Sequence, residues 1–223
     1  MSSFCEKMQA SPAYARVAPY VIFILLTFSQ SMFGEAGQYW VYLGKSVVGA
    51  WLIWQMWDLV PEMRWNFNTE AFAIGLAVLI MWIGIDGLYP HLGGTDAKPV
   101  NPYAQFGDHS PLATIYIIGH ILGMTLVVPP LEEVFFRSFL YRYFVNTNFL
   151  EMPMSRFHPT SFIVTSALFG FEHHEWLSGI LCGFAFQWLV ISKNRLGDAI
   201  TAHAITNLLL GLWIVARGAW HFW

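Results

Sequence analysis

Seven apolar runs fill most of the 223-residue chain and limit its fold more than any other pattern in the sequence. They span about residues 15–33, 39–60, 70–88, 112–146, 159–174, 176–192 and 197–217. A helix needs roughly 20 mainly apolar residues to cross a bilayer. Backbone in lipid must satisfy its own hydrogen bonds, which a helix does. The runs therefore predict transmembrane helices joined by short connections.

The composition also indicates that the chain lies in a lipid bilayer. The chain is 56% hydrophobic and 11% charged, against about 45–50% and about 25% in soluble domains. So few charges cannot cover a water-facing surface. A net charge of −3 without clustered Lys and Arg excludes a nucleic-acid binder. We predict an all-α, polytopic transmembrane helical bundle that forms a single integral-membrane domain over residues 1–223.

The run at 112–146 decides the topology, because it is long enough for one kinked crossing or for two. Two crossings make eight spans and divide the Lys and Arg of the connections four to five. One crossing makes seven spans and divides them seven to two, as the positive-inside rule describes. The seven are Lys7, Arg16, Arg64, Arg142, Arg156, Lys193 and Arg195, and the two are Lys98 and Arg217. We therefore prefer seven spans over eight, with the N-terminus in the cytoplasm and a kink at Pro129-Pro130.

Ionisable residues inside spans are costly and are functional candidates by default. Glu132, Glu133 and Arg137 follow the double proline within the longest run. Glu133 and Arg137 are four residues apart, so they share a helix face and are able to pair. Glu132 is displaced by about 100° around the axis, which leaves it without that cation. A structural ion pair that locks helices together would explain the same residues.

Two further pairs stand four residues apart on later runs, Phe169 with His173 and His203 with Asn207. Taken singly, His173 and Asn207 are also explained by interhelical hydrogen bonds. Three polar clusters on three helices favour a shared interior, since lipid would penalise each of them. Counted from the helix ends near 146, 159 and 197, they lie roughly 9 to 21 Å deep at 1.5 Å per residue. We therefore expect a pocket that opens to the cytoplasm.

A glutamate beside a histidine can activate water, and two donors on one face can stabilise an oxyanion. These are the requirements of amide hydrolysis. The order and spacing of the three motifs resemble the CPBP family of CAAX-type and bacteriocin-processing intramembrane glutamic proteases, over about residues 112–211. The motifs are E-E-x-x-x-R at Glu132, Glu133 and Arg137, F-x-x-x-H at Phe169 and His173, and H-x-x-x-N at His203 and Asn207.

The resemblance implies a role for each motif residue and places the catalytic core at 112–211. Glu132 and His173 would activate water, and His203 and Asn207 would form the oxyanion site. Three residues would support them, namely Glu133, Arg137 and Phe169. The chain length, the aromatic-rich helices and the loop that contains YPHLGGT and NPY look similar to the exosortase and PEP-CTERM associated branch of this family. That loop, at about residues 89–111, we expect to be ordered by its aromatic side chains.

We predict no cofactor. A zinc-dependent membrane protease is the nearest rival, but HExxH is absent, and a closed ligand set would need groups that already have other roles. A non-catalytic membrane scaffold or immunity protein would keep the fold without the reaction. The expected partners are the lipid bilayer and a membrane-embedded or lipidated protein or peptide substrate. The expected location is the bacterial inner membrane, as a multi-pass protein.

Overall fold

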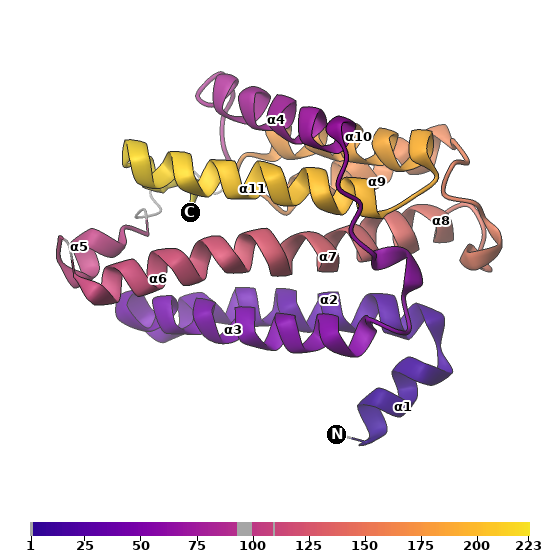
Figure 1. Ribbon diagram of the computed structural model, residues 1–223, viewed down its shortest axis with the longest axis horizontal. Coiled ribbons are helices and arrows are strands. Elements are labelled where there is room, and N and C mark those ends of the chain that lie inside the picture. Colours follow the sequence, from indigo (N-terminus) through magenta and orange to yellow (C-terminus); the bar gives the residue numbers. More distant parts are fainter. Residues whose placement is uncertain (1, 93–99, 109) are drawn as a thin grey trace.

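The computed structural model describes residues 2–92, 100–108 and 110–223, and these residues form helices and connections without a strand. Helices occupy all seven predicted ranges (Figure 1). Their bounds are α2 Pro12–Ser29, α3 Gly34–Met56, α4 Thr69–Gly84, the continuous segment Pro111–Tyr143, α9 Pro159–Phe171, α10 Trp176–Lys193 and α11 Gly197–Arg217. The predicted all-α bundle is confirmed.

Four helical segments are long and apolar enough to cross a membrane: Pro12–Phe33, Pro111–Tyr143, Trp176–Lys193 and Gly197–Arg217. Two apolar helices, α4 and α9, are shorter, and α3 has 23 residues. Large apolar side chains also point away from the core, among them Phe28, Trp54, Ile80 and Trp188, each more than half exposed. A water-soluble domain would bury such side chains. The protein is therefore an integral membrane protein, and the count of seven crossings stays a prediction.

The segment Pro111–Tyr143 is one continuous helix with two wide turns in it. It comprises α6 Pro111–Leu122, the π-helical turn η3 Gly123–Val127, α7 Val128–Glu133, the π-helical turn η4 Val134–Leu140 and α8 Tyr141–Tyr143. Pro129 and Pro130 have no N–H to give to the carbonyls four residues earlier. The helix widens where those carbonyls lie, and the N–H of Val128 reaches back to the carbonyl of Gly123. The predicted distortion at the two prolines is thus a π-helical turn. Such turns inside α-helices occur frequently at functional sites.

The helices pack as layers around this central rod (Figure 1). In the figure, α2 and α3 lie below α6 to α8, whereas α11 lies above them, with α4, α9 and α10 beyond it. Close packing of α4 on α11 depends on Gly75, because a Cβ there would meet the carbonyl of Ala202 at 2.6 Å. The hydroxyl of Thr206 also donates to the Gly75 carbonyl at 2.9 Å.

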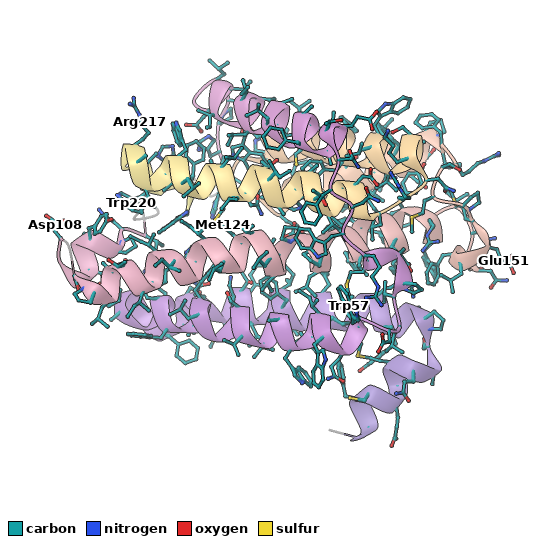
Figure 2. All side chains as sticks on the ribbon, in the orientation of Figure 1. Trp57, Asp108, Met124, Glu151, Arg217 and Trp220 are labelled. Carbon is teal, nitrogen blue, oxygen red and sulfur yellow. The ribbon has the colours of Figure 1, made fainter. Side chains whose placement is uncertain are left out.

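The bundle has two ends, which we name by the short helices beside them. The α1 end lies near α1 Ser2–Ala10 and holds the connections at 57–68, 144–158 and 194–196. The α5 end lies near α5 Pro102–Phe106 and holds the described parts of the 85–110 connection, the turn at 172–175 and the C-terminal residues 218–223. Figure 2 shows Glu151 at the first end and Asp108 and Arg217 at the second.

Polar and aromatic contacts tie the described part of the predicted 89–111 loop to the bundle. Tyr89 hydrogen-bonds Ser178 at 2.7 Å, the indole of Trp176 donates to the Pro90 carbonyl at 2.8 Å, and Phe106 packs edge-on against Tyr39. Residues 93–99 and 109 lie outside the described residues. For the remainder, the expected ordering by aromatic side chains is confirmed.

Candidate active site

The motif in α7 and η4 forms the predicted ion pair. Glu133 and Arg137 lie one turn apart, with Arg137 Nε 3.2 Å from Glu133 Oε2, and their side chains are 0% and 2% exposed. The guanidinium carbon of Arg137 also lies 4.1 Å from the ring centre of Phe169. A desolvated cation on an aromatic face is worth up to about 2 kcal/mol. Arg137 therefore joins the first motif to the second.

His203 of α11 lies between the two glutamates. Its Nδ1 is 2.9 Å from Glu133 Oε1, and its Nε2 is 3.9 Å from Glu132 Oε2. The i,i+4 rule does not predict this contact, because α7 and α11 are far apart in sequence. The Glu133 contact is within hydrogen-bond distance and fixes the ring. The 3.9 Å from Glu132 is too long for a hydrogen bond, so Nε2 is not held by that carboxylate.

His173 lies at the end of α9, in the turn that leads to α10. Its Nδ1–H donates to the Phe169 carbonyl at 2.9 Å, so Nε2 of the neutral ring keeps its lone pair. Its ring packs against Phe169 at 5.0 Å and edge-on to Trp82 at 5.4 Å. Within the described residues, Glu132 and His173 make no direct hydrogen bond or ion pair, and Glu132 Oε2 is buried without a hydrogen-bond partner.

Asn207 lies one turn after His203 on α11, as its spacing predicts. Its Nδ2 donates to the Met124 carbonyl at 2.7 Å, and Met124 belongs to the widened turn η3 (Figure 2). A side-chain amide has two N–H donors. One of them is held by this carbonyl, which orients the amide and leaves the second donor for another acceptor.

A cavity of about 160 Å³ is lined by four of the motif residues. These are Phe169, His173, His203 and Asn207. The lining also includes Glu175, Cys182, Thr206, Trp82, Met124, Val128, Leu210 and Phe222. Glu132 is not among the lining residues, but its Oε2 lies 3.9 Å from Nε2 of the lining residue His203. The cavity thus combines polar side chains of the motifs with a larger number of apolar side chains.

The cavity lies toward the α5 end of the bundle. Trp82 is two residues from the end of α4, Glu175 is in the turn at 172–175, and Phe222 is in the C-terminal 3-10 turn Trp220–Phe222. This differs from the predicted pocket, which was to open at the end near 146, 159 and 197. The depth calculation gave positions along the helices, but it carried no information on which end is filled by packed side chains.

Four residues near the site were not among the predicted site residues. The Tyr20 hydroxyl of α2 donates to the Glu172 carboxylate, and the Tyr20 ring stacks on Phe135 at 4.1 Å. Glu175 and Cys182 line the cavity. Glu172 and Glu175 flank His173 and His174 in the sequence, so a signal for them was present next to the second motif.

A metal site would need several ligating side chains close together. Among residues 2–92, 100–108 and 110–223, no group of three or more His, Cys, Asp or Glu side chains has the arrangement of a metal site. The prediction that the reaction needs no cofactor is not tested by this result.

Fold and site together define a polytopic helical membrane protein with a buried cluster of glutamate, arginine and histidine side chains beside a cavity. Residues 114–209, somewhat less than half of the chain, match a family model named Rce1-like. Its description is type II CAAX prenyl endopeptidase Rce1-like. This part of the chain is similar to that domain, and the match supports a CAAX-type membrane endopeptidase. Neither the curated proteins nor the solved structures give a significant match.

Proposed function

We propose that the protein hydrolyses a peptide bond of a membrane-associated protein with a water molecule activated by Glu132 and His173. The water oxygen attacks the carbonyl carbon, and its proton passes to the activating groups. The carbonyl oxygen becomes an oxyanion that His203 and Asn207 stabilise. The C–N bond then breaks, and the retained proton goes to the departing amine.

The observation that carries this proposal is the position of His203, which lines the cavity and contacts both glutamates. A substrate carbonyl group bound in the cavity would lie next to the imidazole, whose Nε2 is 3.9 Å from Glu132 Oε2. The Glu133 carboxylate contacts His203 Nδ1, and Arg137 pairs with the same carboxylate. This arrangement supports general acid–base chemistry in a site of buried side chains, where electrostatic interactions are strong.

Two more features support the assigned roles. The Phe169 carbonyl fixes the His173 tautomer, so its basic nitrogen is available to take a proton. Asn207 lies one helical turn from His203, and both side chains line the cavity. Among the described residues, the Asn207 amide donates to the Met124 carbonyl alone, which leaves one N–H for a substrate oxygen. Donors that are oriented before the reaction contribute most to oxyanion stabilisation.

We place the substrate's cleavage site in a membrane-embedded or lipidated segment, because the cavity lies inside the bundle and is lined mainly by apolar side chains. We further propose that the protein resides in a bacterial cytoplasmic membrane with its N-terminus in the cytoplasm. The branch associated with exosortase and PEP-CTERM sorting stays a prediction from the sequence.

The test compares the new protein termini in the membranes of cells that carry wild-type protein, Glu132→Gln or Glu151→Gln. Glu151 lies in an exposed 3-10 turn at the α1 end, so its variant is a matched carboxylate-to-amide control. Wild type and Glu151→Gln should produce the same termini, and Glu132→Gln should produce none of them. If no terminus depends on Glu132, the protease proposal fails, and a scaffold or immunity role is favoured.

Metal dependence is tested on the purified protein with the substrate found in that comparison. Activity should persist after chelation. Loss of cleavage on chelation and its recovery with zinc would instead favour the zinc-dependent reaction.

A further inference from the structure

Three of the cavity residues lie at or next to the α5 end. They are Trp82 near the end of α4, Glu175 in the turn at 172–175, and Phe222 in the C-terminal 3-10 turn. On α11, the lining begins at His203 and continues through Leu210 toward the helix end at Arg217. The cavity therefore extends from the buried histidine toward the α5 end.

Packed backbone closes the α1 end over the same helices. Asn66 N–H donates to the Gly197 carbonyl at 3.3 Å, and the Asn68 amide donates to Asp198 Oδ1 at 2.6 Å. A Cβ added to Gly197 would clash with the Arg64 carbonyl. These contacts press the connection at 57–68 against the start of α11.

Side chains fill the remaining space at that end. Met63 and Leu196 are each 1% exposed, and both belong to the main hydrophobic core. His203 is only six residues from the start of α11, but no route to it through this packing is evident within the described residues. A substrate that approached from the α1 end would have to displace the connection at 57–68.

Cations are concentrated at the α1 end. Outside the buried core, that end carries Lys7, Arg64, Arg156, Lys193 and Arg195, whereas the described residues of the α5 end carry Arg217. Lys98 belongs to the same connection as α5 and lies outside the described residues. Connections rich in Lys and Arg stay in the cytoplasm. The charge distribution therefore assigns the α1 end to the cytoplasm and the α5 end to the opposite side.

From these three observations we infer that the substrate enters the cavity from the extracytoplasmic half of the membrane. The substrate class is a membrane-inserted protein segment whose cleavage site lies in the outer half of the bilayer. This inference rests on the proposed function for the reaction, but the side of entry is a separate property of the fold.

The size of the cavity limits what enters it. A volume of about 160 Å³ is close to that of an engineered 150 Å³ cavity that binds benzene. It accommodates one apolar side chain beside the scissile bond, packed on Trp82, Leu210 and Phe222. Longer apolar groups of the substrate would remain in the surrounding lipid.

The first experiment maps the two ends with single cysteines in full-length protein that carries Cys5→Ser. Gln105→Cys is exposed in α5 and Ser155→Cys is exposed at the α1 end, and native Cys182 is buried. A membrane-impermeant maleimide added to intact spheroplasts should label Gln105→Cys, and it should label Ser155→Cys only after lysis. Ala104→Cys repeats the test if Gln105→Cys is not produced. Labelling of Ser155→Cys in intact spheroplasts would overturn the inference.

The second experiment measures access to the cavity itself. Leu210→Cys lies on the cavity wall, and the protein also carries Cys5→Ser and Cys182→Ser because Cys182 lines the same cavity. A small, charged methanethiosulfonate reagent is added either outside spheroplasts or to inside-out vesicles. Modification should occur at least tenfold faster from the outside. Equal rates, faster modification from the cytoplasmic side, or no modification from either side would overturn the inference. Labelling needs no catalysis, so Glu132→Gln should give the same rates, and failure of the protease proposal would be recognised separately.

Discussion

A buried ion network at the α1 end offers a sharp test of what holds the two halves of the chain together. Glu62, in the connection between α3 and α4, accepts from Arg16 of α2 at 2.6 Å and from Ser138 of η4 at 2.5 Å. Arg142 of α8 lies 3.3 Å from the same carboxylate. Glu62→Gln would keep the side chain's shape but leave two buried arginines without their counter-charge.

The cost follows from the burial of the partners. The side chains of Arg16, Arg142 and Glu62 are 3%, 6% and 15% exposed. Removing one partner of a buried pair costs about 3–5 kcal/mol, and the low end applies because Gln still accepts one hydrogen bond. At about 2–4 °C per kcal/mol for a chain of this size, the Tm of Glu62→Gln should fall by about 6–12 °C. Thermal unfolding in detergent measures this shift.

The fall in Tm that Glu62→Gln causes should also depend on pH. Burial by itself would raise the pKa of the Glu62 carboxyl, but the charge of Arg16 and the Ser138 hydrogen bond outweigh it and hold this pKa below its ordinary value. A depressed pKa in the folded state adds stability above the unfolded pKa of about 4.3, and that stability disappears as the pH falls through the folded pKa. The Tm difference between wild type and Glu62→Gln should be constant from about pH 7 to about pH 5 and shrink below about pH 4.

Glu70→Gln is the matched control. Glu70 pairs with Lys193, but its side chain is 59% exposed, and exposed pairs contribute only about 0–1 kcal/mol. Its Tm should change by less than about 4 °C. Equal Tm shifts for the two variants would refute the assignment of the Glu62 network as a buried structural element, as would a Tm difference that does not change down to pH 3.

Three further outcomes are expected. Gly75→Ala should lower the Tm by several degrees because its Cβ would meet the Ala202 carbonyl at 2.6 Å, whereas Gly84→Ala, with no atom within 4 Å, should leave the Tm unchanged or raise it slightly. Asn207→Ala should lower kcat about 10²–10³-fold with little change in KM, as the loss of an oxyanion donor does; a rise in KM alone would contradict the role. Arg137→Lys should lower the Tm by about 4–8 °C, since Lys loses about 2 kcal/mol of desolvated ring contact; an unchanged Tm would show that charge alone is sufficient.

The sequence predicted the helices well because each depends on a local property. Apolar runs mark the spans, and the helix predicted at 197–217 has these same bounds in the structure. The Glu133–Arg137 pair was predicted for the same reason, since a four-residue spacing on a helix fixes which side chains meet.

Relations between helices were harder to predict. The contacts of His203 with Glu132 and Glu133 depend on how α7 and α11 pack, which no spacing within either helix reveals. The expected pairing of Glu132 with His173 is not a direct contact within the described residues, because the Phe169 carbonyl holds His173 Nδ1 and the ring faces the cavity. The π-turns that flank α7 also change which residues face the core after them, and their positions were not predicted.

The site also depends on helices that carry none of its motifs. Tyr20 of α2, outside the Rce1-like segment, donates to Glu172 at the turn that presents His173. Gly75 of α4 accepts from Thr206, between His203 and Asn207 on α11. Each contact holds one wall of the cavity from a helix that lies before residue 111. The predicted core at 112–211 contains the proposed reacting groups, but α2 and α4, which carry no recognisable motif, contact the elements that present them.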